Sequence, residues 1–133
     1  MTEPIVININ NEFDIVLARQ KGREVSKELL FGGVDQARIT TAISELARNI
    51  YLYAGSGQIT ISILEDNGRR GIQISASDNG PGISDIRMVL QDGFSTSGGL
   101  GAGLPGVKRL MDTFDIDSVP GAGTTITISK WAR

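Results

Sequence analysis

Cysteine and histidine are both absent from this chain of 133 residues. Without cysteine there is no disulfide, no zinc–thiolate site and no thiol nucleophile. Without histidine there is no serine–histidine hydrolase centre, no histidine metal ligand and no histidine phosphoacceptor. These absences exclude several large classes of enzyme in one step.

A strong net charge and long apolar runs are also missing. The formal net charge of −2 provides no electrostatic footprint for nucleic acid, and no patch for an anionic membrane is visible. No apolar run approaches the length of a membrane span, and the N-terminus lacks the layout of a signal peptide. We therefore expect a cytoplasmic protein, folded as a single domain over residues 1–133, with no nucleic-acid or membrane partner.

What the chain does contain is glycine, with 17 residues concentrated in its second half. Between the glycines, apolar residues recur at strand and helix spacings. Clustered helices and hairpin strands indicate an α+β fold, a sandwich with one mixed, mostly antiparallel sheet covered by helices on one face. The expected strands are 5–9, 59–63, 72–78, 115–119 and 124–130, and the expected helices run from Asn11 to Gly32, from Asp35 to Gly55, over 85–90 and over 104–114. The second of these helices is expected to carry an apolar stripe made of Ile39, Ile43, Leu46, Ile50 and Tyr53.

An acidic turn follows the third expected strand, at residues 78–82, Asp-Asn-Gly-Pro-Gly. Side chains alternate along a strand, so Asp78 is directed to the same side as the apolar Ala76 and Ile74. A carboxylate on that side is costly unless hydrogen-bond donors meet it. The glycines let the backbone approach closely. The pattern is typical of a pocket floor built around one acceptor, although an isolated Asp-x-Gly more often caps a surface turn.

The second expected helix carries Glu45 and Asn49, four residues apart and therefore on one face. A carboxylate can orient a nucleophile, and an amide oxygen can bind Mg²⁺, which prefers hard oxygen ligands. The alternative is a solvated helix edge on which Glu45 pairs with Arg48, an interaction that contributes little.

A glycine-rich stretch over 93–104 precedes the last expected helix. Backbone N–H groups of such a loop, together with the helix N-terminus, can bind an anion, and the loop can form a lid. Because no lysine or arginine lies between Met88 and Val107, phosphate charge would be met by N–H groups, the helix dipole and a metal ion. A flexible surface loop is the alternative.

On the last expected strand, Thr124 shares a face with Ile126 and Ile128 and so points into the apolar layer, as Asp78 does. A hydroxyl and a carboxylate that converge from neighbouring strands can bind the polar edge of a flat ring. The alternative is the ordinary preference of threonine for strands.

In order, these elements resemble the conserved boxes of the GHKL ATPase and kinase superfamily. The asparagine box is 45–49, the first glycine box is 78–82, the second is 99–104, and the last is 123–124. The resemblance implies the Bergerat ATP-binding fold. It implies that Glu45 is the general base, that Asn49 holds Mg²⁺, and that the following residues bind ATP: Asp78, Gly80, Gly82, Gly99, Gly101, Gly103, Leu104 and Thr124.

Within the superfamily, gyrase, mismatch-repair and chaperone ATPases carry further domains, and sensor histidine kinases need a histidine. Residues 35–51 and 92–112 are instead similar to the anti-sigma factor and switch kinase family, especially its stressosome switch kinases. That resemblance implies a serine/threonine kinase that phosphorylates STAS-domain antagonist and scaffold proteins and, when released, binds and activates a serine phosphatase. The alternative is an anti-sigma factor that sequesters a sigma factor. A third, weaker alternative is an ATPase domain of a larger machine.

Overall fold

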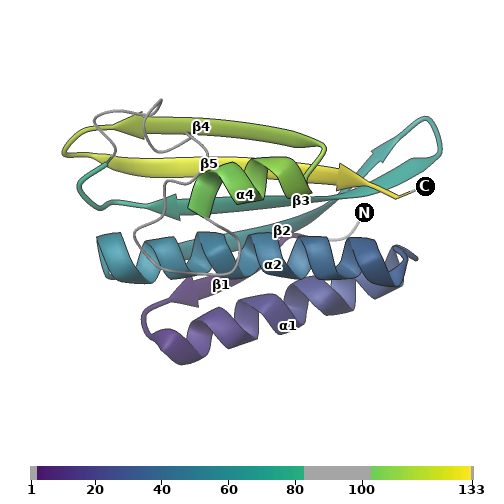
Figure 1. Cartoon of the computed structure of the whole chain (residues 1–133), viewed down its shortest axis with the longest axis horizontal. Helices are drawn as coiled ribbons and strands as arrows, with labels where there is room; N and C mark the ends of the chain where they lie inside the picture. Colours follow the sequence, from purple (N-terminus) through teal and green to yellow (C-terminus); the bar gives the residue numbers. More distant parts are fainter. Residues whose placement is uncertain (1–2, 83–102, 133) are drawn as a thin grey trace.

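The computed structural model describes residues 3–82 and 103–132, drawn in colour in Figure 1. The expected helix at 85–90 and most of the glycine-rich loop lie outside the described residues. The elements in chain order are β1 Ile5–Ile9, α1 Glu12–Glu28, α2 Gly33–Asn49, the π-helical turn η1 Ile50–Ala54, β2 Gly57–Asp66, β3 Arg69–Asp78, α4 Gly103–Leu110, β4 Thr113–Val119 and β5 Gly123–Trp131.

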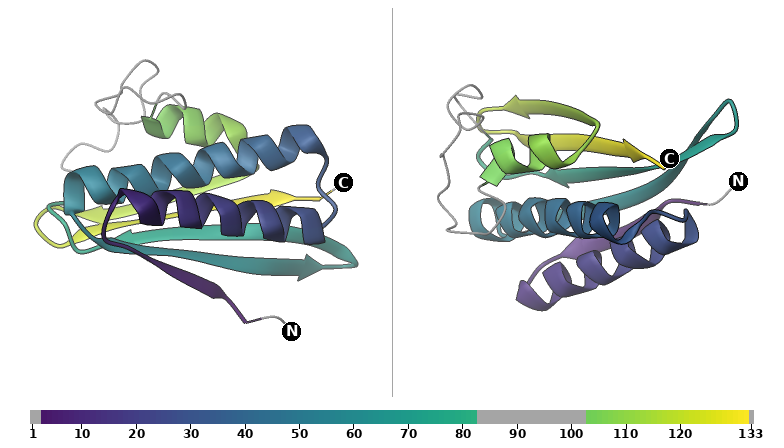
Figure 2. Two further views of the ribbon diagram at one scale, coloured as in Figure 1. Left: turned by 90° about the horizontal axis from the view of Figure 1, so that it is seen from below. Right: turned by 45° about the vertical axis from the view of Figure 1, so that its right-hand side comes forward.

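The strands form one sheet in the order β1-β2-β3-β5-β4. Each described pair of neighbouring strands is antiparallel. The sequence had predicted a mixed, mostly antiparallel sheet. The helices α1, α2 and α4 lie on one face of this sheet, as Figures 1 and 2 show. The α+β sandwich predicted from the sequence is confirmed.

The core lies between the helices and the sheet. Along β2, β3 and β5 the buried apolar side chains alternate with polar ones, because one face is covered and the other is open. The buried side chains of this layer include Ile43 and Leu46 of α2, Ile61 of β2, Ile74 of β3 and Ile128 of β5. The same alternation fixes which side chains at the strand ends face the helices.

The first helix begins as predicted and ends earlier. Asn11 accepts a hydrogen bond from the Asp14 backbone N–H at 3.1 Å, and the Asp14 carboxylate accepts one from the Asn11 N–H, which completes a capping box. At the other end, the Leu30 N–H donates to the carbonyl of Lys27 and the Phe31 N–H donates to that of Ser26. These bonds form a Schellman motif, so α1 stops at Glu28 rather than at the glycine pair. Gly32 instead occupies the N-cap of α2.

The second helix changes pitch where the sequence predicted a continuous stripe to Tyr53. After Asn49 the chain makes one π-helical turn, in which the Gly55 N–H donates to the Ile50 carbonyl at 2.9 Å. Ile50 stays buried, but the wider turn leaves Tyr53 48% exposed. The expectation that Tyr53 continues the apolar stripe is therefore wrong.

The last helix is shorter than expected. It ends at Leu110, and β4 begins at Thr113, so Met111 and Phe114 lie in the following turn and strand. In the part of the chain that the structure describes, no helix has the length and apolarity needed to cross a membrane.

Candidate functional site

The ends of neighbouring strands bring together a row of side chains from distant parts of the sequence. Asp78 at the end of β3 is paired directly with Thr124 on β5 and, on its other side, with Gly57 on β2. Thr124 is in turn paired with Ser118 on β4. A carboxylate therefore stands beside a pair of hydroxyls on the face that the helices cover, as predicted for Asp78 and Thr124.

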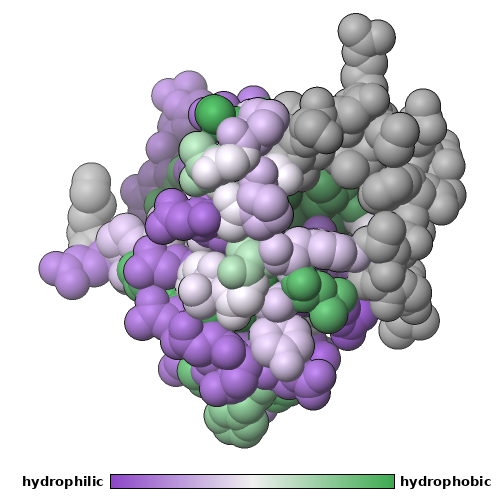
Figure 3. Space-filling view, turned by 90° about the vertical axis from the view of Figure 1, so that its left-hand side faces the viewer, coloured by the Kyte–Doolittle hydropathy of each residue, from purple (hydrophilic) through white to green (hydrophobic). Residues whose placement is uncertain are grey.

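Figure 3 looks directly at this end of the molecule. Its centre is occupied by residues of intermediate hydropathy, and strongly hydrophilic residues gather to the left and below. Thr124 is 9% exposed and Asp78 is half-buried. The pair is thus recessed, yet Asp78 keeps an accessible part.

The turn after Asp78 is held by the carboxylate itself. The Gly80 N–H donates to Asp78 Oδ1 at 2.9 Å, which leaves the second carboxylate oxygen, Oδ2, for another donor. The turn then approaches the β4–β5 hairpin, where the Gly121 N–H donates to the Pro81 carbonyl at 2.6 Å. Gly82 adopts a φ of +76°, and a Cβ there would lie 2.3 Å from the Val119 carbonyl oxygen, so only glycine fits this contact.

The predicted helix residues lie at the same end of the molecule. The π-helical turn η1, which continues α2, contacts the Asp78 turn: a Cβ on Gly80 would stand 2.7 Å from Ala54 Cβ. Glu45 is not at a solvated helix edge, since its side chain is only 3% exposed. Its Oε1 lies 3.7 Å from Arg48 Nη1, so the ion pair of the alternative interpretation exists, but it is formed by a buried carboxylate.

Asn49 is half-buried at the last position of α2. Within the described residues, its side chain makes no capping hydrogen bond to the π-helical turn. Its amide oxygen is therefore not used by that turn. The described residues contain no group of three or more acidic side chains that could enclose a metal ion. A single hard oxygen donor of this kind fits Mg²⁺ that keeps most of its ligands as water and phosphate oxygens.

Of the predicted glycine-box residues, Gly103 and Leu104 begin α4 and are both buried. Gly99 and Gly101 lie outside the described residues. The sequence interpretation missed Ser118. The alternation of side chains along the strand could have revealed it, because Ser118 lies on the same face as Ile116 and Phe114. The hairpin that follows places Ser118 opposite Thr124.

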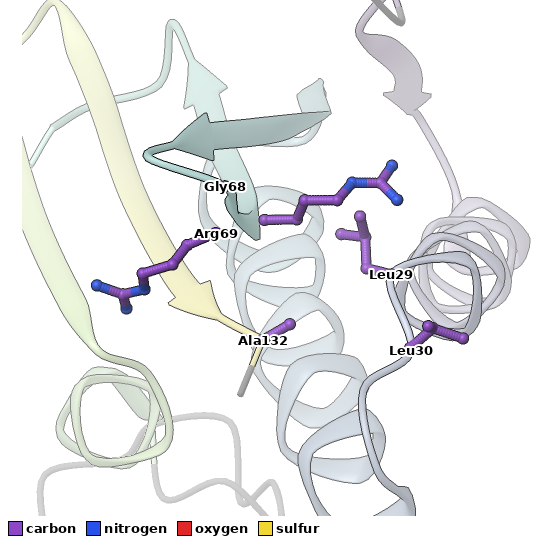
Figure 4. A pocket seen from close by; sticks show the side chains of 6 residues that line it. Leu29, Leu30, Gly68, Arg69 and Ala132 are labelled. Atoms are coloured by element: carbon purple, nitrogen blue, oxygen red, sulfur yellow. The ribbon is translucent and has the colours of Figure 1, made fainter.

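A second concavity lies at the opposite end of β3. It is a groove of about 670 Å³ between the end of α1, the β2–β3 hairpin and the C-terminal end of β5, seen in Figure 4. Arg69 points away from Leu29 and Leu30 in this view, and its guanidinium carbon lies 4.8 Å from the centre of the Trp131 ring. The groove is lined by Leu29, Leu30, Gly68, Arg69, Arg70 and Ala132.

Comparison with known proteins agrees with this geometry. Residues 34–132 match the family of histidine kinase-, DNA gyrase B- and HSP90-like ATPases. The chain is 66% identical to the serine/threonine-protein kinase RsbT of Bacillus subtilis over 133 residues, which covers 100% of both chains. It is 31% identical to the anti-sigma F factor of Caldanaerobacter subterraneus over 102 residues, which covers 71% of this chain and 69% of that one.

A solved structure shares the fold. It contains the RsbU and RsbW domains of a Mycobacterium tuberculosis protein and superposes with a TM-score of 0.70 at 21% identity, covering 99% of this chain and 33% of that one. The family match and the full-length similarity lead to the same conclusion. The chain belongs to the family of histidine kinase-, DNA gyrase B- and HSP90-like ATPases, and within it to the serine/threonine-protein kinases related to RsbT.

Proposed function

We propose that the protein transfers the γ-phosphate of ATP to a serine or threonine hydroxyl of a STAS-domain partner. The observation that carries the proposal is the direct pairing of Asp78 with Thr124 on the buried face of the sheet. Asp78 Oδ1 is occupied by the Gly80 N–H, so Oδ2 is the oxygen available to the exocyclic amino group of adenine. Thr124 would bind the neighbouring part of the ring, directly or through water.

The triphosphate would extend from this pocket toward the C-terminal end of α2 and the N-terminus of α4. Gly103 and Leu104 open α4, and the free N–H groups of a helix N-terminus favour phosphate. By the family resemblance, the other predicted members of this box, Gly99 and Gly101, are also proposed to bind ATP through backbone N–H groups. Bound Mg²⁺ would neutralise charge on the phosphate oxygens, and Asn49 is the residue that would hold it.

Glu45 is the proposed general base. Its carboxylate would accept the proton of the incoming hydroxyl while the oxygen–γ-phosphorus bond forms and the bond to the β,γ-bridging oxygen breaks, releasing ADP. Arg48 is placed to orient this carboxylate, since Nη1 lies 3.7 Å from Oε1. Burial keeps bulk water away from Glu45, which favours proton transfer from the acceptor hydroxyl over hydrolysis.

The partners proposed here follow from the family resemblance and the RsbT relationship. We propose STAS-domain antagonist and scaffold proteins as acceptors, and a serine phosphatase as the target that the released kinase activates. The cytoplasm is the proposed location. With these partners the protein would act as a switch, because phosphorylation of one partner would free the kinase to bind another.

The test is transfer of label from γ-labelled ATP, with Mg²⁺, to a purified STAS-domain protein. Glu45→Ala should slow transfer by about 10²–10⁴-fold while ATP affinity stays close to wild type. Arg48→Ala is the matched control, because it removes the same ion pair but leaves the carboxylate. Its rate of transfer should fall much less than that of Glu45→Ala. Equal transfer by wild type and Glu45→Ala would refute the role of Glu45.

Similarity to an anti-sigma factor favours one other function, nucleotide-dependent capture of a sigma factor. Labelling of a STAS-domain protein and co-purification with a sigma factor together distinguish the two proposals. If ATP binds but no STAS-domain protein is labelled, and the chain co-purifies with a sigma factor, capture is the function. Labelled STAS protein with no sigma-factor complex supports the kinase.

A further inference from the structure

Ser118 stands next to the proposed adenine pocket without belonging to any of the boxes that the sequence indicated. It lies on β4 directly opposite Thr124 of β5, and the two hydroxyl oxygens, Oγ and Oγ1, are 2.8 Å apart. Ser118 Oγ also lies 3.2 Å from the Gly123 carbonyl oxygen, to which it can donate. The row Asp78, Thr124, Ser118 therefore ends in two coupled hydroxyls.

Two arrangements of protons satisfy these distances. In the first, Ser118 donates to the Gly123 carbonyl and Thr124 donates to Ser118, so that Thr124 offers only an acceptor to a ligand. In the second, Ser118 donates to Thr124 Oγ1, and the Thr124 proton is free to point into the pocket. Through its contact with Thr124, Ser118 thus influences whether Thr124 meets a ligand as a donor or as an acceptor.

The two arrangements suit different purines. Adenine carries an amino donor at C6 beside the acceptor N1, whereas guanine carries a carbonyl acceptor at C6 beside the donor N1–H. Asp78 can only accept and therefore takes the amino group of adenine. Its neighbour Thr124 must then donate toward N1, directly or through a water molecule, and this requires the second arrangement.

We propose that Ser118 is a specificity-determining positioning residue, which donates to Thr124 and thereby presents the Thr124 proton to adenine. The proposal rests on the proposed nucleotide function. Ser118 acts through Thr124, so its effect has a signature that a general structural role would not produce: removing its hydroxyl should matter only while the Thr124 hydroxyl is present.

The experiment is isothermal titration of ATP and GTP, with Mg²⁺, into the full chain and its variants. Ser118→Ala should weaken ATP binding by roughly 3- to 10-fold, the range expected for one hydroxyl hydrogen bond, and lower the ratio of ATP to GTP affinity. In the Thr124→Val background, Ser118→Ala should change ATP affinity by less than about 1.5-fold, because no hydroxyl remains to be oriented.

The same strands provide a matched control. Thr113 of β4 and Ser129 of β5 form another cross-strand hydroxyl pair, and Ser129 lies five residues beyond Thr124 along β5, farther from Asp78 in the register of the sheet. Thr113→Ala removes a hydroxyl from that pair and should leave both nucleotide affinities unchanged. A loss of ATP affinity in Thr113→Ala equal to that in Ser118→Ala would overturn the proposal.

Failure of the proposed nucleotide function and failure of the role of Ser118 give different results. If wild type binds neither nucleotide, the proposed function itself fails. If Asp78→Asn weakens ATP binding but Ser118→Ala changes neither affinity nor the ATP to GTP ratio, the pocket stands and the role of Ser118 is wrong. If Ser118→Ala weakens ATP binding equally with and without the Thr124 hydroxyl, Ser118 does not act through Thr124.

Discussion

Gly123 and Asp78 are in backbone contact: a Cβ on Gly123 would lie 2.1 Å from the Asp78 carbonyl oxygen. Gly123 also has a φ of +125°, a conformation that L side chains rarely adopt. The backbone that carries Asp78 is therefore fixed from one side by a residue with no side chain. Thr124 follows Gly123 directly, so the same contact fixes both members of the proposed adenine pair.

Gly123→Ala should consequently displace Asp78. We expect ATP affinity to fall at least tenfold and the free energy of unfolding to fall by about 1–3 kcal/mol from overpacking, measured by titration calorimetry and urea denaturation. Gly121→Ala is the control, because Gly121 has a φ of +81° but a Cβ there would meet no heavy atom of the described residues within 4 Å. If the two variants bind ATP equally, the contact with Asp78 does not position the site.

Asp78→Asn should weaken ATP binding by about one to two orders of magnitude, the range for a hydrogen bond to a charged group. The asparagine carbonyl oxygen can still accept from the Gly80 N–H, whose bond to Oδ1 is 2.9 Å long. The turn should therefore persist, and the thermal midpoint should change little. Unchanged ATP affinity in a folded Asp78→Asn protein would remove Asp78 from the adenine site.

Leu30→Gly should stabilise the protein. Leu30 occupies the left-handed position after α1 with a φ of 64°, and it is 85% exposed. Left-handed leucine costs about 1–2 kcal/mol, which glycine avoids at some cost in chain entropy, so we expect a net gain of a few tenths to about 1 kcal/mol. Leu30→Ala, which removes the exposed side chain but keeps the backbone strain, should not raise the thermal midpoint. A lower midpoint in Leu30→Gly would contradict the strain argument.

Lys130→Met should destabilise the fold at the end of the sheet far from the site. Lys130 is 7% exposed, and its Nζ donates to the Leu110 carbonyl at 3.1 Å. It also lies 3.6 Å from Asp112 Oδ1 and 3.9 Å from Asp35 Oδ1. Removing the ammonium leaves these acceptors without this cation. We therefore expect the free energy of unfolding, measured by urea denaturation, to fall by about 1–3 kcal/mol.

Arg38→Met is the matched control for Lys130, because it removes a surface partner of the same carboxylate. Arg38 Nη1 lies 3.0 Å from Asp35 Oδ1, and the arginine side chain is 49% exposed. An exposed pair of this kind contributes less than about 1 kcal/mol. A loss in Lys130→Met no larger than in Arg38→Met would show that Lys130 does not tie α2 and α4 to the sheet.

The parts of the structure that depend on local periodicity could be predicted from the sequence. The alternation of apolar residues placed Asp78 and Thr124 on the buried face, and the sequence after Asn11 marked the start of α1. These features follow from neighbours a few residues apart, which a single sequence displays directly.

The parts that depend on tertiary contacts could not be predicted. The π-helical turn that exposes Tyr53 is adopted where η1 packs against the Asp78 turn, and the apolar stripe gave no sign of it. The early end of α1 places a leucine where glycine is usual. Ser118 meets Thr124 only through the pairing register of β4 with β5, and the burial of Glu45 depends on how α2 packs.

The row Gly57, Asp78, Thr124 and Ser118 draws one residue from each of β2, β3, β5 and β4. The row exists only when all four strands are paired. A nucleotide that binds there therefore binds the native state and not the unfolded chain. Linkage then makes the lifetime of the protein a function of nucleotide supply: a ligand at 100 times its Kd adds about 2.7 kcal/mol to the free energy of unfolding. Proteolysis through global unfolding should slow by about 100-fold under those conditions, so a bound nucleotide would prolong the life of the folded protein.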